Sequence, residues 1–293
     1  MMYFMSRPAT LTREHRECFE AQGFVILRNV LGEETLEGVR REMNWIVNMH
    51  AGEFIEAGRI PNPCYDEPFD RRFLRLYESC LDQAPNSFRT ELHLPGLFPL
   101  FFHPAVLDLA ESILGPEVRL YPNYTARPKL PRHEPTLVLW HQDAGYTDAG
   151  MDPAGEERLT AADLRMVNVW SPLVPARPEN GCMQFIPGTH RLGVVDHVNR
   201  EFYLEIVDRE IEPRLDEAVD VVCDPGDVVL FSNMLFHCGR PNVSDTVRWS
   251  LDWRYQDATQ PTLRPVNGHL ARSRAHPERV VRDPEQWSQL MMS

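Results

Sequence analysis

The sequence predicts a mainly β fold with flanking helices: an antiparallel sandwich or jelly roll that follows a helical N-terminal region. From residue 118 onward, short β-rich runs are separated by turn signals such as Pro187-Gly188 and Pro225-Gly226. No helical patterns alternate with these runs, which favours antiparallel strands over repeated βαβ units. The expected strands are 118–121, 136–142, 165–171, 182–186, 219–223, 227–231 and 247–255.

The first part of the chain, residues 1–117, is expected to be mostly helical. Five apolar residues recur at helical spacing and predict an amphipathic helix over about 33–49; they are Leu36, Val39, Met43, Ile46 and Val47. A further helix is expected to begin at Pro104, because the first turn does not need the N–H that proline lacks, and to end before Gly115. The other expected elements are helices at 11–22 and 70–82, a buried strand at 23–27 and a loop at 51–69.

The composition is that of an ordinary globular protein. The chain has 293 residues, of which 43% are hydrophobic and 25% are charged, and this length buries a sizeable core without disulfides. We therefore expect a single domain over residues 1–293. It consists of the helical part (about 1–117), a jelly-roll core (about 118–255) and an irregular C-terminal tail (about 256–293).

Charge, hydropathy and cysteine usage restrict the partners and the compartment. A net charge of −13 argues against nucleic acid or an anionic membrane as a partner, and no apolar run is long enough to span a bilayer. The six cysteines are scattered without a Cys-x-x-Cys pair, as is typical of reduced cytosolic thiols. We expect a cytoplasmic protein without a signal peptide that acts on a small molecule, and the sequence predicts no particular oligomeric state.

The pattern His141-Gln142-Asp143, together with His237, is the most informative in the chain. Two imidazoles and one carboxylate can occupy one face of a metal ion and leave the opposite face open, which is the ligand set of non-haem Fe(II) oxygenases. On an extended chain, residues 141 and 143 share one face. The alternative for a His-x-Asp match alone is a surface histidine bonded to its neighbour, and His237 after the strand 227–231 favours the metal. Cys238 is expected to be structural.

Arg248, eleven positions after His237, offers a fixed cation for a dicarboxylate co-substrate. The run 247–255 alternates polar and apolar residues, with Arg248, Ser250, Asp252 and Arg254 on one face. Ser250, one pleat away from Arg248, can add a hydroxyl donor. The alternative is a surface ladder of ion pairs, which contributes little stability and is the role expected for Asp252 and Arg254.

Four further residues are candidates for contacts with small molecules: Asn168, Trp170, Tyr124 and Tyr146. Asn168 and Trp170 share one face of the strand 165–171, where Asn168 can donate to the co-substrate and Trp170 can enclose it. The alternative for Trp170 is core packing, the commoner environment of a tryptophan. Tyr146 follows the expected metal ligands closely, and Tyr124 lies in a segment expected to determine specificity.

The segments expected to determine specificity are those that the core does not fix. They are 51–69, 89–102, 121–133 and 144–160. Gly145, Gly150 and Gly155 would allow the last segment to move as a lid.

Several motifs resemble, in this order, those of the phytanoyl-CoA dioxygenase family of Fe(II)/2-oxoglutarate-dependent oxygenases. They are Trp140-His141-Gln142-Asp143, Trp170 followed by Glu179-Asn180-Gly181-Cys182, Ile186-Pro187-Gly188-Thr189-His190-Arg191, Pro225-Gly226-Asp227, His237 and Arg248-Trp249-Ser250, within a resemblance that covers about 11–255. The resemblance implies a double-stranded β-helix, a cupin-like jelly roll of two antiparallel sheets. It also implies that His141, Asp143 and His237 bind Fe(II), and that Arg248 with Ser250 receives the far carboxylate of 2-oxoglutarate.

The function expected from these observations is that of a dioxygenase. With Fe(II), 2-oxoglutarate and O2, it would oxidise, and most often hydroxylate, an unactivated C–H bond of a small metabolite or natural product, releasing succinate and CO2. The presence of Asp143 argues for oxygenation rather than the halogenation found in relatives that lack this carboxylate. The sequence shows no evident patch of basic residues that would bind the phosphates of an acyl-CoA.

Two alternatives belong to other classes. A zinc hydrolase would use the same three ligands to activate water, but it has no need of Arg248 and Ser250 at their spacing. A non-catalytic jelly-roll protein would bind a ligand without chemistry, but it has no need of all three metal ligands.

Overall fold

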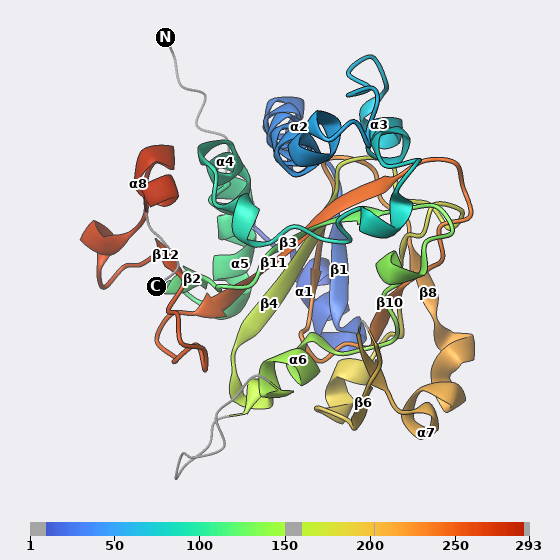
Figure 1. Ribbon diagram of the computed structural model, residues 1–293. Coiled ribbons are helices and arrows are strands. Elements are labelled where there is room, and N and C mark those ends of the chain that lie inside the picture. Colours follow the sequence, from blue (N-terminus) through green and yellow to red (C-terminus); the bar gives the residue numbers. More distant parts are fainter. Residues whose placement is uncertain (1–9, 150–159, 202, 290–293) are drawn as a thin grey trace.

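The computed structural model describes residues 10–149, 160–201 and 203–289 (Figure 1). Its main strands form two antiparallel sheets, which confirms the expected fold class. The larger sheet has the order β1-β9-β4-β11-β2-β12, with β3 also paired to β11, and the smaller sheet has the order β10-β5-β8. The larger sheet consists of β1 (Phe24–Leu27), β2 (Val118–Leu120), β3 (Thr125–Lys129), β4 (Met166–Pro172), β9 (Val228–Phe231), β11 (Arg248–Asp257) and β12 (His269–Arg272). The smaller sheet consists of β5 (Met183–Phe185), β8 (Val219–Val221) and β10 (His237–Gly239), and β6 (His197–Asn199) pairs with β7 (Leu204–Ile206) in a separate hairpin.

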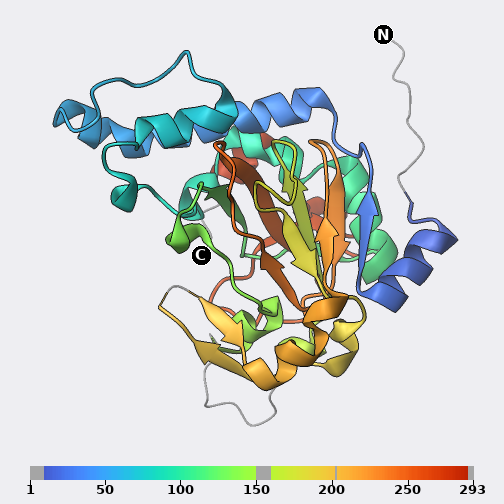
Figure 2. The same cartoon turned by 90° about the vertical axis from the view of Figure 1, so that its right-hand side faces the viewer.

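The helices gather at the ends and on one face of the larger sheet. They are α1 (Arg13–Gln22), α2 (Glu33–Glu56), α3 (Phe69–Leu76), α4 (Phe98–Phe101), α5 (Pro104–Leu114), α6 (Asp143–Ala149), α7 (Asp208–Ile211) and α8 (Pro284–Gln289). Helices α2 and α3 lie across one end of the strands, and α6 lies with the β6–β7 hairpin at the opposite end (Figures 1 and 2). The five apolar residues that predicted α2 are all buried, as expected from their spacing.

The larger sheet separates two apolar cores because its side chains alternate between faces. Trp249, Leu251 and Trp253 of β11 belong to the core that the helices cover, whereas Trp170 and Phe231 belong to the core shared with the smaller sheet. Every residue of β11 is buried. The polar face of β11 therefore lies between the two sheets, and this is the interior in which the site forms.

Several expected boundaries are wrong, for identifiable reasons. Helix α2 continues into the expected loop 51–69 because Ala51 is buried and Phe54 packs against the core. The helix expected at 70–82 ends at Leu76. The tail, expected to be irregular from about 256, contains regular elements in its described part, since β12 pairs with β2 and α8 follows it.

The expected strand 136–142 is also wrong. A 3-10 turn occupies Glu134–Thr136, residue 141 makes only a single bridge, and Asp143 is the first residue of α6. Gly145, expected in a mobile lid loop, lies in α6, where a Cβ atom would come within 2.8 Å of the His197 ring. Gly150 and Gly155 lie outside the described residues.

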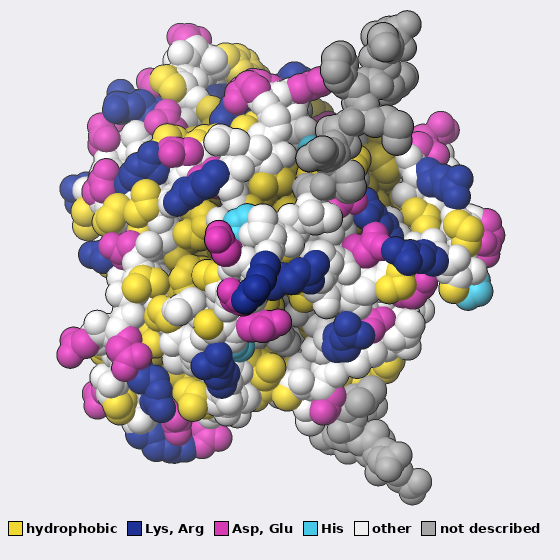
Figure 3. All heavy atoms as spheres, turned by 180° about the vertical axis from the view of Figure 1, so that it is seen from behind, with side chains coloured by type: hydrophobic (Ala, Val, Ile, Leu, Met, Phe, Trp, Pro, Cys, Tyr) yellow, Lys and Arg dark blue, Asp and Glu magenta, His cyan; other side chains and the backbone are white. Residues whose placement is uncertain are grey.

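Acidic and basic side chains are interspersed over the face shown in Figure 3 rather than gathered by sign. Within the described residues, no single helix is both long and apolar enough to cross a bilayer, although the bent pair Pro95–Phe101 and Pro104–Leu114 would qualify by length and composition.

The turn at Gly226 gives a test of the fold. The N–H groups of Val30 and Leu31 both donate to the carbonyl oxygen of Gly226, whose φ is +97° and whose added Cβ would lie 2.8 Å from the Leu31 oxygen. We expect Gly226→Ala to lower the free energy of unfolding by about 1–3 kcal/mol, because alanine adds both backbone strain and a clash. Urea denaturation followed by circular dichroism measures the change.

Gly52→Ala is the matched control. Gly52 lies inside α2, and an added Cβ would meet nothing within 4 Å. It should raise stability by about 0.5–1 kcal/mol, because alanine favours helix. A Gly226→Ala variant as stable as the unaltered protein would contradict the turn as described.

Candidate metal centre

The two histidines of the predicted ligand set are paired through their backbones. The N–H of His141 donates to the carbonyl oxygen of His237 at 2.9 Å, and the N–H of His237 donates to the carbonyl oxygen of His141 at 3.0 Å. Residue 141 thereby continues the smaller sheet beside β10. The pairing sets the two imidazole rings side by side, with centroids 4.0 Å apart.

Gln142 fixes the turn between His141 and Asp143. Its amide nitrogen donates to the carbonyl oxygens of Gly193 and Met234, both at 2.7 Å, and its amide oxygen accepts from the N–H of Val195 at 2.9 Å. Three backbone groups hold this fully buried side chain in place. The side chains of His141 and Asp143, on either side of it, therefore point away from it. His141 and Asp143 meet through this turn rather than through the alternation of a strand.

The three candidate ligands present their donor atoms to one point. Asp143 Oδ1 lies 3.5 Å from Nε2 of His141 and 3.8 Å from Nε2 of His237. The Nδ1 atoms lie 2.8 Å and 2.9 Å from the carbonyl oxygens of Leu139 and Leu235. A carbonyl only accepts, so each Nδ1 carries the proton and each Nε2 keeps a free lone pair, as a metal ligand requires.

The second oxygen of Asp143 is held from behind. Its Oδ2 accepts from the Asn168 amide at 2.8 Å and from two nitrogens of the Arg254 guanidinium. Burial alone would raise the pKa of the Asp143 carboxyl, but the charge of Arg254 outweighs it, so that its pKa lies well below the usual range. Burial and the neighbouring His141 lower the pKa of His237 to about 3. An ionised carboxylate and neutral imidazoles suit a divalent first-row metal.

Arg254 is therefore not part of a surface ladder, and that expectation is wrong. Its side chain is 7% exposed and bridges Asp143 to Asp252. Asp252 is buried as well. The signal available in the sequence was the wholly apolar opposite face of the same strand, because a strand with such a face lies in the interior. Asn168, predicted to donate to the co-substrate, lies against Asp143 instead.

Arg248 lies deeper in the same interior. Its guanidinium donates to the carbonyl oxygen of Gly181 at 3.2 Å and to the hydroxyl of Ser250, and its Cζ lies 5.6 Å from the centroid of the Trp170 ring. Burial lowers its pKa to about 10. Among the described residues no carboxylate pairs with it. A buried guanidinium without a counter-charge is costly, so a carboxylate ligand suits this position.

A narrow pocket joins Arg248 to the metal ligands. Its lining includes Trp170, Phe231, His237, Arg248 and Asp143. The residues present therefore fit both Fe(II) and 2-oxoglutarate: three ligands at one end, a guanidinium without a carboxylate at the other, and an aromatic wall along the side. Trp170 and Ser250 both lie next to Arg248.

Lys129 is a neighbour of this pocket that sequence reasoning did not assign. It stands opposite Arg248 in the pairing of β3 with β11 and donates to the Gly239 and Thr136 carbonyl oxygens at 3.1 and 3.4 Å. Burial, followed by the charge of Arg248, lowers its pKa well below the usual value. No local pattern around residue 129 announces this position.

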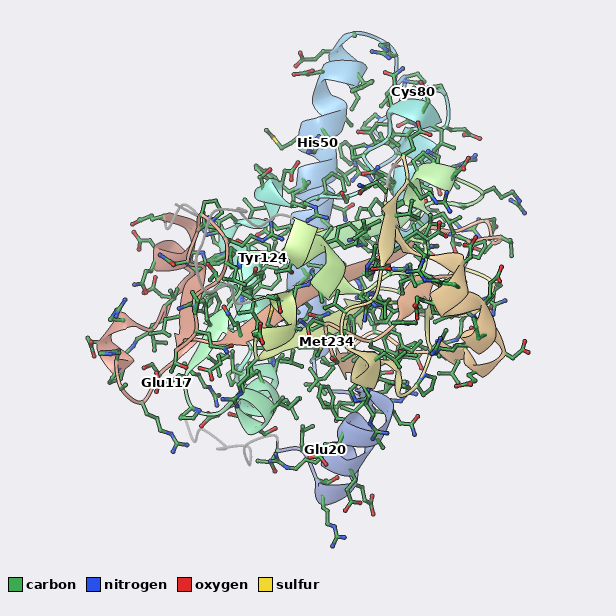
Figure 4. All side chains as sticks on the ribbon, turned by 90° about the horizontal axis from the view of Figure 1, so that it is seen from below. Glu20, His50, Cys80, Glu117, Tyr124 and Met234 are labelled. Atoms are coloured by element: carbon green, nitrogen blue, oxygen red, sulfur yellow. The ribbon has the colours of Figure 1, made fainter. Side chains whose placement is uncertain are left out.

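A second cavity of about 320 Å³ opens on the other side of the metal ligands. It is lined by Asn86, Ser87, Arg89, Asn123, Arg127, Val138, His141, Asp143, Tyr146, Tyr203, Arg254 and Arg264. Tyr146, predicted to meet the substrate, is in this lining, and its hydroxyl accepts from the N–H of Leu204 at 2.8 Å. Tyr124 is not in it. That side chain packs in the aromatic core against Phe101 and Trp287, well separated from Glu20 on α1 (Figure 4).

Comparison with known proteins agrees with this arrangement. A family model described as phytanoyl-CoA dioxygenase (PhyH) matches residues 19–250. The chain belongs to this family. The resemblance that its motifs predicted is thereby confirmed.

Individual members and solved structures are similar to the chain to different extents. The 1-deoxypentalenic acid 11-beta-hydroxylase of Streptomyces arenae is 30% identical over 173 residues, which cover 55% of this chain and 56% of that protein. The chain thus spans about half the length of this curated relative. The structure of the non-heme monooxygenase ThoJ in its apo form has a TM-score of 0.59 at 23% identity, covering 92% of this chain and 88% of that one. EctD from S. alaskensis with 2-oxoglutarate and 5-hydroxyectoine has a TM-score of 0.56 at 18% identity, covering 85% and 77%. These likenesses show the shared fold.

The Asp143–Arg254 contact gives a test of the centre. We expect Arg254→Met to weaken Fe(II) binding by about 10–100-fold, because the residue that orients a metal-binding carboxylate is lost. Anaerobic titration calorimetry with Fe(II) measures the affinity. Arg165→Met is the matched control, since Arg165 pairs with Asp257 from a side chain that is 56% exposed. Equal affinities of Arg254→Met and the unaltered protein would contradict the role given to Arg254.

Proposed function

We propose that this protein is a non-haem Fe(II)- and 2-oxoglutarate-dependent dioxygenase that oxidises a C–H bond of a small molecule. The observation that carries the proposal is the pairing of two features in one interior. A two-histidine, one-aspartate cluster has its donor atoms within 4.8 Å of one another, and Arg248, buried without a carboxylate partner, lies in the pocket beside it. The family match and the small-molecule hydroxylase of Streptomyces arenae support the proposal.

Each residue has a defined task in this function. His141, Asp143 and His237 would hold the iron, and Arg248 with Ser250 would bind the far carboxylate of 2-oxoglutarate. When bound, iron supplies the oxidising chemistry: one oxygen atom of O2 converts 2-oxoglutarate to succinate and CO2, and the other enters the substrate. Trp170 and Phe231 exclude water from the pocket, and Asn168 with Arg254 keeps Asp143 oriented.

The alternatives leave parts of the site without a task. A zinc hydrolase needs the three ligands and a water molecule, but not a buried guanidinium next to the metal. A ligand-binding protein gains nothing from Nδ1–H groups tied to carbonyl oxygens, which serve to fix the tautomer of metal-binding histidines. Asp143 closes the position that a halide would need.

Co-substrate binding gives the deciding experiment. Anaerobic addition of Fe(II) and 2-oxoglutarate should produce a weak visible charge-transfer band, because both must chelate at one centre. We expect Arg248→Leu to weaken 2-oxoglutarate binding by about 10–150-fold, the equivalent of the 1.5–3 kcal/mol of a charge-assisted hydrogen bond. Titration of the band with 2-oxoglutarate measures the affinity.

Arg240→Leu is the control for this experiment. Arg240 follows β10 directly but pairs with Asp220 from a side chain that is 38% exposed, so the affinity should not change. If the unaltered protein gives no band with Fe(II) and 2-oxoglutarate, the proposed function is wrong.

A further inference from the structure

The second cavity, of about 320 Å³, is the larger of the two spaces beside the metal ligands and is called the larger cavity below. Its surroundings hold more positive than negative charge. The guanidinium groups of four residues line it, and the carboxylates near them number two; the arginines are Arg89, Arg127, Arg254 and Arg264, and the acids are Asp143 and Asp252. Arg89, Arg127 and the pair Arg254 and Arg264 come from three separate parts of the sequence, so that the sequence shows no basic patch. The fold alone brings them together.

Two of the four arginines are neutralised by the two acids. Arg127 donates to Oδ2 of Asp252 at 2.9 Å, and Arg254 donates to Oδ1 of the same residue at 2.6 Å. Arg254 also binds Asp143. Asp252 and Arg254 are buried and Arg127 is half-buried, and both arginines line the cavity together with the metal ligands His141 and Asp143.

In the part of the chain that the structure describes, the guanidinium groups of the other two arginines bind only neutral groups. Arg89 donates to the side-chain oxygen of Asn123 at 3.2 Å, and Arg264 lies 3.4 Å from the hydroxyl of Tyr121. Arg89 is exposed and Arg264 is half-buried, so both stand where the cavity meets solvent. Arg127 and Arg254 line the same cavity, and their positive charges repel that of Arg89. An anion beside these groups would relieve their repulsion.

The iron and the co-substrate do not remove this excess. Fe(II) carries two positive charges and 2-oxoglutarate two negative ones, so the loaded centre adds no net charge. Arg248 takes the far carboxylate of 2-oxoglutarate at the other end of the interior. Arg89 and Arg264 therefore face a substrate that has yet to enter.

From this arrangement we infer that the substrate is a small anion, whose carboxylate or phosphate group is bound by Arg89 and Arg264. The inference rests on the proposed function and names the substrate class of the same site. Guanidinium groups bind both kinds of anion through paired hydrogen bonds. A cavity of about 320 Å³ is at the small end of ligand sites. It therefore suits a single small molecule that carries both the anionic group and the carbon to be oxidised.

The binding experiment uses the protein loaded with Fe(II) and 2-oxoglutarate under anaerobic conditions. The probes are benzoate and phenyl phosphate, each beside its neutral counterpart, benzamide or phenol. We expect at least one anion to raise the melting temperature by several degrees and the neutral molecules to have no effect. The shift should shrink at high salt, because part of the attraction is screened.

The variants Arg89→Met and Arg264→Met assign the effect to the two residues. Each should reduce the affinity for the anion by about 10–150-fold, since each removes a charge-assisted contact. Arg71→Met is the matched control, because it removes the same charge from the surface ion pair between Arg71 and Asp245. Comparison of benzoate with phenyl phosphate shows which anion the site prefers.

A turnover experiment separates recognition from a structural role. A panel of small carboxylic acids with their amides, and of phosphate monoesters with their alcohols, is screened by succinate release and by the mass of the product. For any substrate found, Arg89→Met and Arg264→Met should lower kcat/KM for the anion and leave the value for the neutral analogue unchanged. Equal losses for both members of a pair would indicate a structural role and overturn the inference.

The outcomes distinguish this inference from the proposed function. If the charge-transfer band forms but neither anion stabilises the protein, or if Arg89→Met and Arg264→Met respond to both anions as the unaltered protein does, the inference is wrong and the dioxygenase stands. If the band does not form, the dioxygenase itself fails. The band should persist in Arg89→Met and Arg264→Met, because neither residue touches the ligand atoms.

Discussion

Two reciprocal hydrogen bonds between the backbones of His141 and His237 are the constraint on which the centre depends. They join the end of an irregular segment to β10 and fix the separation of the two imidazoles without any metal. Gln142 then turns the chain so that Asp143 completes the set. Because backbone and amide groups hold these residues in place, the three donor atoms have no partners among the described residues except one another. Because the ligands are already in position, they lose less conformational entropy when a metal binds.

Strand β11 is the second determinant, since one face of it supplies the polar groups of both ends of the interior. Arg248 and Ser250 stand at the co-substrate end, and Asp252 and Arg254 stand behind Asp143. The opposite face packs Trp249, Leu251 and Trp253 under the helices. The apolar face thus provides the burial free energy that holds a strand of charged residues in the interior, where each charge is paired or is directed at a ligand pocket.

The sequence predicted what depends on local periodicity and on spacing. Alternation along 247–255 placed Arg248 correctly, and helical spacing identified the buried residues of α2. The segment 136–142 misled because its conformation depends on distant carbonyl groups, those of Gly193 and Met234, that no local pattern reveals. The same limit applies to the larger cavity, whose arginines come from three separate parts of the sequence, and to Tyr124, whose aromatic surroundings come from α4 and α8.

The position of Lys129 has a practical consequence. It is the sole lysine of the sequence, and its side chain is almost completely enclosed between the strand that carries Arg248 and the carbonyl oxygen of Gly239. Amine-directed cross-linkers and dyes therefore find no accessible ε-amino group on the native protein. Acylation of Lys129 would therefore show that the two sheets around it have unfolded. This single side chain is thus an intrinsic chemical sensor of unfolding.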